Sequence, residues 1–319
     1  MLRKLASSMI ILLLITIPSI AVAEEIDVNE FVRSVTVQIV VSVEKYTRSL
    51  DWYQEINADG SRSDWKVRYG KWEEPERIEV VGSGFIVYSG SAPYGNELIG
   101  VTYILTNAHV VSLMVREGMR GSAYIPLDIF SAEDIIFTTM PPGIVIKEGA
   151  RPVEQQYFIL DRDYVSIRHS EDQLYEVQAR VVAYDELLDV ALLELRNVWG
   201  LPSAKFRKEP PKVAEEMIIC GAPLGIGFSL DYGKINQVGL DLGISGGISW
   251  NRQVKVSIAA APGSSGSGIF DAQTGEVVAQ LHGCLVYQGN YIAGGQLANE
   301  GRRIAEWLRW SGWAFILEQ

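Results

Sequence analysis

Histidine and cysteine are scarce in this sequence, with three histidines and two cysteines among 319 residues. His109, His169 and His282 lie far apart without the spacing of a metal site, so no metal or other cofactor is expected. Two cysteines are too few for a scaffold held by many disulfides. Cys220 and Cys284 both lie in apolar runs, where they could remain buried thiols or, in an oxidising compartment, pair with each other.

Basic residues are also few: 28 Lys and Arg stand against 39 Asp and Glu, which gives a formal net charge of −11 at pH 7. A surface of this sign repels phosphate backbones and anionic lipid headgroups, so no nucleic-acid partner is expected. The charge indicates no particular oligomeric state. Because 48% of the residues are hydrophobic, the chain can build one large core or two smaller ones.

Long apolar runs are absent after the first 23 residues. The opening segment begins with two basic residues, continues with an apolar run over 9–20 that Pro18 interrupts, and ends in Ala-Val-Ala. This pattern predicts a signal peptide over 1–23 and a secreted or periplasmic mature chain that starts at Glu24. A membrane anchor is the alternative, but a span needs about 20 mostly apolar residues. We therefore expect no stable membrane span after signal cleavage.

Short runs rich in β-branched and aromatic residues dominate the remaining sequence, and Gly, Asn, Asp and Pro separate them. Their number and length favour an all-β fold, either barrels or sandwiches. The predicted strands are 34–43, 82–89, 101–111, 164–170, 175–185, 189–195, 215–221, 253–261, 268–271 and 275–283.

Four segments break this strand pattern. Residues 201–212 contain Pro210-Pro211, which cannot continue a strand interior, and are expected to connect two β units within one domain over 24–319. The units are expected at about 30–200 and 213–295. Segments 44–80 and 112–160 are interpreted as surface insertions on the β scaffold. Residues 297–310 have an apolar stripe typical of a C-terminal helix.

A cluster of glycines and serines occupies residues 261–271, with the sequence APGSSGSGIFD. Such a cluster could be a flexible linker, a phosphate-binding loop or a turn that exposes a nucleophile. No lysine follows the glycines, which argues against a phosphate-binding P-loop. The G-x-S-x-G pattern of another hydrolase class is not met either, because no serine here has glycine both two positions before it and two positions after it.

A serine hydroxyl becomes a good nucleophile only when a base takes its proton and a third group orients that base. His109 ends the run YILTNAHVV, and Asp189 directly precedes the apolar run VALLEL. Asp185 competes with Asp189 for the orienting role, but only Asp189 adjoins the strand. The chain order is then His109, Asp189 and a serine of the cluster.

This order and the sequence motifs around the three residues resemble those of the trypsin-like serine peptidases, especially the HtrA/Deg-like branch that is exported by bacteria. The motifs that carry the resemblance are GSGFIV with ILTNAHVV, YDELLDVALLEL, IICGAPLGIGFS and AAAPGSSGSGIFDAQTGEVVAQLHG, in that order over residues 34–310. The resemblance implies a chymotrypsin-like fold of two six-stranded antiparallel β-barrels with the C-terminal helix outside. It also implies endopeptidase cleavage of a polypeptide substrate.

Residue by residue, the resemblance implies His109 as base, Asp189 as its partner and Ser265 as nucleophile, with the N–H groups of Gly263 and Ser265 as the oxyanion hole. Three features depart from the family. Ser264 is not the aspartate of digestive-type members, the chain has no IVGG-like start, and no PDZ module is expected after the helix.

The residues of the specificity pocket are expected to include Ala260 and His282. Strict alternation along 275–283 would turn His282 away from Leu281, and so into the cleft if Leu281 faces the core. A histidine there resembles the glutamyl endopeptidases and would favour an acidic side chain before the cut. Ala260 lacks the hydroxyl that those enzymes carry, so a small apolar side chain is the alternative.

Two other functions compete with a peptidase. A catalytically weak or silent peptide-binding or chaperone-like module could keep the same fold, and only the intact set of His109, Asp189 and Ser265 argues against it. An esterase is disfavoured by the order of these three residues along the chain.

Overall fold

The computed structural model describes residues 27–94, 97–112, 127–131, 133, 135–139, 142–160, 165–169, 175–245, 248–249, 251–287 and 290–318. The predicted signal peptide and its cleavage point lie outside the described residues. The helices are α1 (Val28–Val35) and α3 (Gly301–Trp310), and the 3-10 turns are η1 (Ala108–Val111), η3 (Pro223–Gly225) and η4 (Ala314–Leu317).

The strands run in chain order as follows. They are β1 (Thr36–Tyr53), β2 (Lys66–Tyr69), β3 (Glu76–Tyr94), β4 (Glu97–Thr106), β5 (Leu127–Phe130), β6 (Ile135–Thr139), β7 (Pro142–Ile146), β8 (Pro152–Leu160), β9 (Val165–His169), β10 (Tyr175–Asp185), β11 (Val190–Arg196), β12 (Glu216–Gly221), β13 (Ser229–Leu240), β14 (Ile244–Ser245), β15 (Ile248–Ser249), β16 (Gln253–Val256), β17 (Gly268–Asp271), β18 (Val277–Tyr287) and β19 (Asn290–Glu300).

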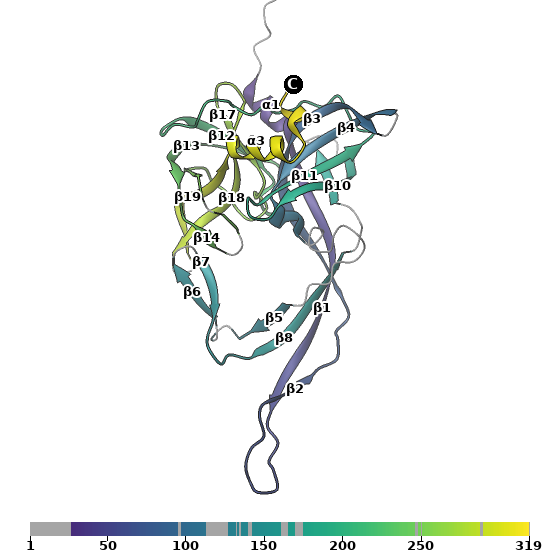
Figure 1. Ribbon diagram of the computed structural model, residues 1–319, viewed down its shortest axis with the longest axis vertical. Coiled ribbons are helices and arrows are strands. Elements are labelled where there is room, and N and C mark those ends of the chain that lie inside the picture. The colour runs from purple at the N-terminus through teal and green to yellow at the C-terminus, as the bar shows by residue number, and fades with distance from the viewer. Residues whose placement is uncertain are drawn as a thin grey trace, which may run out of the picture.

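Two closed antiparallel rings of six strands form the body of the molecule (Figure 1). The first, barrel one, runs β1-β3-β4-β11-β10-β9 and closes because β1 pairs with both β3 and β9. The second, barrel two, runs β12-β13-β16-β19-β18-β17. The sequence expectation of an all-β, chymotrypsin-like fold with two six-stranded barrels is confirmed.

Strand β11 shows why some runs are apolar at every position. Side chains alternate between the faces of a strand, so successive residues enter different cores. Ala191 and Leu193 enter the core of barrel one, together with Ile39 and Ile104 of neighbouring strands. Leu192 enters a separate cluster that lies between the barrels. A strand buried on both faces therefore reads as a continuous apolar run.

The cluster between the barrels joins them into one body. Phe85 of β3 and Phe270 of β17 meet edge to face with ring centroids 6.0 Å apart, and both side chains are fully buried. Helix α3 adds Ile304 and Trp307 to the same cluster from outside. Burying four large side chains of this kind contributes roughly 2 kcal/mol each to folding.

Helix α3 begins at Gly301, later than the predicted start at 297. Residues 297–300 instead continue β19, where Leu297 pairs with Lys255 and Asn299 pairs with Gln253 of β16. The apolar stripe that predicted the helix is real from Ile304 onward. Pairing with the neighbouring strand decides the conformation of the residues before it, so the predicted start was wrong.

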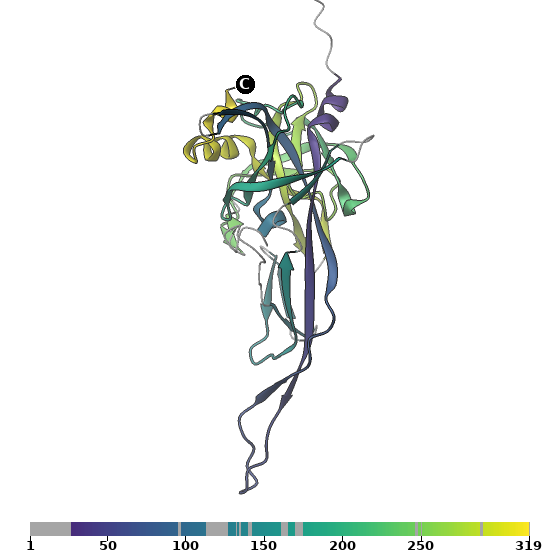
Figure 2. The same ribbon diagram turned by 90° about the vertical axis from the view of Figure 1, so that its right-hand side faces the viewer.

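Segment 44–80 was expected to be a surface insertion, and it forms an arm that extends barrel one. Strand β1 continues past the barrel to pair with β2 from Leu50 to Tyr53, and Figures 1 and 2 show this hairpin projecting away from both barrels. Arg48 stacks on the rings of Tyr69 and Trp72, with the guanidinium carbon 4.0 and 4.3 Å from their centroids. These cation–π contacts stabilise the arm, which extends beyond the hydrophobic core of barrel one.

Part of segment 112–160, strands β5 and β8, lies beside the same arm. Strand β8 pairs with β1 from Val43 to Ser49, and β5 pairs with β8. Strands β6 and β7 form a separate hairpin. Other residues of this segment lie outside the described part of the chain.

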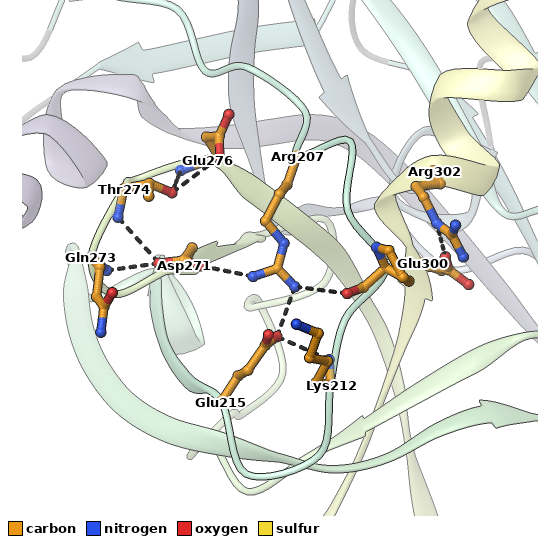
Figure 3. A network of polar contacts seen from close by, with 10 residues as sticks. Arg207, Lys212, Glu215, Asp271, Gln273, Thr274, Glu276, Glu300 and Arg302 are labelled. Atoms are coloured by element: carbon orange, nitrogen blue, oxygen red, sulfur yellow. Dashed lines mark hydrogen bonds and ion pairs between the residues drawn. The ribbon is translucent and has the colours of Figure 1, made fainter.

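The predicted connection over 201–212 joins the barrels and is held by Arg207 (Figure 3). The guanidinium of Arg207 is almost buried and donates to Asp271 Oδ2 and to Glu215 Oε2, both at 2.7 Å. Burial by itself would lower the pKa of Arg207, but the two carboxylates outweigh it and raise the pKa. The ion pairs therefore fasten the connection onto barrel two.

None of the helices in the described ranges has the length and apolar character needed to cross a membrane.

Candidate active site

His109 and Asp189 meet at the edge of barrel one. Strand β4 ends at Thr106, before the predicted end at 111, and His109 lies in the following turn η1. The ring Nδ1 of His109 lies 2.8 Å from Asp189 Oδ2, and the backbone N–H of His109 donates to Asp189 Oδ1 at 2.9 Å. A carboxylate only accepts, so Nδ1 carries the proton and Nε2 has a free lone pair. The imidazole is about 42% exposed, so Nε2 can exchange protons in the cleft.

Asp189 is buried and adopts a backbone conformation that is unusual for its type, with φ of 57°. The turn before β11 is fixed by Asp185, whose carboxylate accepts from the Leu188 N–H at 2.8 Å. Burial by itself would raise the pKa of the Asp189 carboxyl, but contacts from His109 and His282 outweigh it and lower the pKa to about 2. Asp189 is therefore ionised at neutral pH.

Ser265 lies half-buried in a turn whose glycines are required by its geometry. Gly263 and Gly266 have φ of 96° and 90°, in the region that favours glycine. A Cβ on Gly266 would lie 2.1 Å from the carbonyl oxygen of Ser83. The cluster is thus neither a linker nor a phosphate loop, but a tight turn pressed against barrel one.

Ser83, from the motif GSGFIV, holds this turn in place through hydrogen bonds. Its hydroxyl donates to the Gly263 carbonyl at 2.7 Å and accepts from the Ala222 N–H at 2.9 Å, while its own N–H donates to the Ser265 carbonyl at 2.8 Å. The sequence analysis assigned Ser83 no role. Its place between two glycines of a quoted motif was the available signal.

The peptide groups of the turn leave two N–H groups unused. The Pro262 carbonyl accepts from Leu224 N–H at 2.6 Å, and the Ser264 carbonyl accepts from Ser267 N–H at 3.1 Å. In a trans peptide the next N–H points the opposite way, so the N–H groups of Gly263 and Ser265 face away from these partners. Within the described part of the chain, neither N–H has a backbone or side-chain acceptor.

A pocket of about 450 Å³ opens beside Ser265. Besides Ser265, it is lined by Ala260, Ala261, Pro262, Leu281, Gly283, Cys284 and Gln296. The lining carries no charged side chain, and Gln296 is its main polar group. Ala260 is therefore where the sequence analysis expected it. Both cysteines are free thiols, so the possible pairing is not made.

His282 does not face this pocket, which corrects the expectation from strict alternation. Its side chain is fully buried on the side of Asp189, with Nδ1 3.6 Å from Asp189 Oδ2 and Nε2 2.5 Å from Gln253 Oε1. The reason is a β-bulge in β18 between Leu281 and Gly283, which breaks the alternation at His282. Burial lowers the pKa of the His282 imidazole, although Asp189 partly opposes this.

Among the described residues there is no group of three or more His, Cys, Asp or Glu side chains that could hold a metal ion. The third histidine, His169, lies away from the site, where its Nε2 is 2.7 Å from the carbonyl oxygen of Ser34.

Comparison with known proteins identifies the family and the fold. Curated relatives include two proteins named probable periplasmic serine endoprotease DegP-like, from Ectopseudomonas mendocina (strain ymp) and Pseudomonas putida (strain ATCC 700007 / DSM 6899 / JCM 31910 / BCRC 17059 / LMG 24140 / F1). They are 28% and 29% identical over 137 residues, which cover 43% of this chain and 27% of each relative. The chain thus spans about a quarter of their length.

Solved structures with the same fold include the HtrA-type protease AlgW with a tripeptide and with a decapeptide. Their TM-scores are 0.51 and 0.50, at 14% and 15% identity, covering 89% and 90% of this chain and 63% and 66% of theirs. The trypsin-like peptidase domain matches residues 82–279, which is more than half of the chain and includes His109, Asp189 and Ser265. The chain therefore belongs to the trypsin-like peptidase family.

Proposed function

We propose that this chain is a serine endopeptidase that cleaves polypeptides through an acyl-enzyme. The observation that carries the proposal is the double contact of the buried Asp189 carboxylate with the backbone and the ring of His109. This contact fixes the tautomer of His109 and aims Nε2 outward as a base. Membership of the trypsin-like peptidase family and the tight turn at Ser265 support Ser265 as the nucleophile.

In the proposed reaction, His109 Nε2 takes the proton of the Ser265 hydroxyl as its oxygen attacks the carbonyl carbon of the substrate. The N–H groups of Gly263 and Ser265, which have no acceptor among the described residues, bind the resulting oxyanion. His109 then protonates the leaving amine, and the peptide bond breaks. A water molecule, deprotonated by His109, hydrolyses the ester and releases the second product.

The signal sequence and the periplasmic DegP-like relatives support a location outside the cytoplasm, with cleavage after Ala23 and a mature chain from Glu24. The peptides bound to the two AlgW structures support a polypeptide substrate. N-terminal sequencing of the protein purified from its host tests the location, and an intact Met1 would contradict it.

A fluorophosphonate probe tests the proposed chemistry directly, because it labels only an activated serine. We expect labelling of the wild type at Ser265 and none of Ser265→Ala. Ser264→Ala is the matched control, since that hydroxyl accepts only a long hydrogen bond from Ala261 N–H. If the folded wild type is not labelled, the chain is a binding module rather than an enzyme.

A further inference from the structure

Three buried polar side chains of barrel two lie behind Asp189, on neighbouring strands. They are Gln253 of β16, His282 of β18 and Asn299 of β19, and none of them is more than 5% exposed. Asp189 belongs to barrel one, whereas these three side chains belong to the barrel that carries Ser265. Burying a polar group costs free energy unless it is hydrogen-bonded.

A chain of contacts runs through them and returns to where it started. Asn299 Nδ2 donates to the carbonyl of Leu188 at 2.7 Å, and Gln253 Nε2 donates to Asn299 Oδ1 at 3.1 Å. Gln253 Oε1 lies 2.5 Å from His282 Nε2, and His282 Nδ1 lies 3.6 Å from Asp189 Oδ2. The two ends of the chain are therefore the consecutive residues Leu188 and Asp189.

The direction of every hydrogen bond in this chain follows from two backbone carbonyls. The carbonyls of Leu188 and Asn251 only accept, and they face the amide nitrogens of Asn299 and Gln253. Flipping either side-chain amide would place its oxygen against a backbone carbonyl oxygen, and neither atom can donate a proton. Gln253 therefore presents its oxygen to the ring, and His282 holds a proton on Nε2.

Asp189 needs such support because its backbone conformation is unfavourable. A φ of 57° is rare for residues other than glycine and persists only when the surroundings hold it. On one side, Asn107 Nδ2 donates to the Asp189 carbonyl at 3.0 Å. On the other side, Asn299 binds the Leu188 carbonyl, and the His282 ring closes off the carboxylate.

We propose that Gln253, Asn299 and His282 act as a polar bracket that positions Asp189 for the reaction. This inference rests on the proposed function. The bracket lets barrel two, which holds the nucleophile, also set the position of the carboxylate in barrel one. Catalysis is sensitive to displacements of about 1 Å, so a looser Asp189 would place the His109 ring poorly while leaving the substrate pocket intact.

The test breaks the bracket at two places with side chains of similar size, Gln253→Met and Asn299→Leu, and combines them. Fluorophosphonate titration first counts the active sites, and kcat and KM for a peptide are then measured per titrated site. We expect each variant to lower kcat by about 10- to 100-fold with KM changed less than twofold. Thr102→Val is the control, because it removes a buried hydrogen bond to Val198 O outside the site.

Two further readouts separate positioning from a loss of stability. First, the acid limb of the kcat/KM profile is expected to move to lower pH, because a displaced Asp189 stabilises the His109 imidazolium less. Among the described residues, the bracket itself contains the ionisable His282, and the charged groups that act on it are Asp189, His109 and Arg303, of which Arg303 donates to the Asn251 carbonyl. Second, the double variant is expected to be no more than about threefold worse than the poorer single variant, because residues of one network are not additive.

Three outcomes overturn the bracket: single variants within twofold of wild type, losses that multiply in the double variant, or losses confined to the number of titrated sites. These results differ from failure of the proposed function, in which the wild type itself is not labelled. In addition to these three outcomes in the bracket variants, an equal loss of kcat in the control Thr102→Val would overturn the proposal.

Discussion

The two barrels hold their parts of the site in different ways. In barrel one, His109 and Asp189 contact each other directly, and barrel two adds the His282 ring beside the Asp189 carboxylate and the Asn299 hydrogen bond to Leu188 O. In barrel two, the Ser265 turn depends on barrel one, because Ser83 binds both the Gly263 and Ser265 carbonyl groups. The turn that holds Ser265 is therefore shaped at the interface between the barrels, whereas the contact of His109 with Asp189 is made within one of them.

The largest effect is expected from breaking the pair within barrel one by Asp189→Asn. The amide of Asn has one acceptor oxygen and one donor nitrogen, whereas His109 presents two donors, its backbone N–H and its ring Nδ1–H. One of these donors therefore loses its acceptor, and the ring is no longer held in the tautomer that leaves Nε2 as the base. We expect kcat to fall by about four orders of magnitude with the fold retained. Asp185→Asn in the same turn is the control and should stay within a few-fold of wild type, as measured by peptide hydrolysis. A smaller loss in Asp189→Asn than in the control would remove Asp189 from its proposed role.

Arg207 provides a contrast, because its buried contacts stabilise barrel two without touching the site. Arg207→Met would leave the carboxylates of Asp271 and Glu215 without their shared partner (Figure 3). We expect the free energy of unfolding to fall by about 3 kcal/mol, while the labelling rate of the folded protein stays unchanged. Urea denaturation and fluorophosphonate kinetics measure the two quantities. A slower labelling rate would link the connection to the site.

Removing the Ser83 hydrogen bonds that join the two barrels should have an intermediate effect on activity. Ser83→Ala removes the hydroxyl that binds the Gly263 carbonyl and the Ala222 N–H, so the N–H groups of Gly263 and Ser265, proposed to bind the oxyanion, lose their fixed orientation. We expect kcat/KM for a peptide to fall by roughly 10- to 100-fold. Ser34→Ala, which removes a hydroxyl bonded to Phe31 O in α1, is the matched control. Equal activity of both variants would mean that the turn holds its shape without barrel one.

The same contrast explains which features of the structure could be predicted from the sequence. Local patterns predicted an all-β fold, and the resemblance of four short motifs to the trypsin-like peptidases implied the two barrels and selected His109, Asp189 and Ser265. The side of the strand on which His282 lies could not be predicted, since a bulge in β18 follows from pairing with β19. Ser83, Gln253 and Asn299 act through partners that are distant in sequence, and only the folded chain brings these together.

The pocket of barrel two predicts a smaller effect, on specificity. Its lining of Ala260, Leu281, Cys284 and Gln296 offers no charge, so a charged side chain would be buried without a partner. We expect peptides with Ala or Val before the cut to exceed those with Glu or Lys by about tenfold or more in kcat/KM.

Ala260→Leu should shrink the pocket and penalise Val more than Ala at that position. Ala259→Leu is the matched control, because Ala259 is exposed and lies outside the pocket lining. A preference for Glu would contradict the neutral pocket. It would mean that His282 acts on substrate despite its burial.

The smallest effect is expected from the arm, the part of barrel one that lies farthest from the site (Figure 2). Trp65 of the arm is covered by Arg151 of the neighbouring segment, with the guanidinium carbon 3.7 Å from the ring centroid, and no described residue of the arm lines the Ser265 pocket. Replacing residues 51–68 by Asn-Gly would join Leu50 to Tyr69, which already face each other across the hairpin, by a favoured two-residue turn. We expect kcat/KM for a small peptide within about twofold of wild type. A tenfold loss in the folded variant would show that the long strands of barrel one transmit strain to His109, and the two barrels would then be less separate in their roles than the contacts indicate.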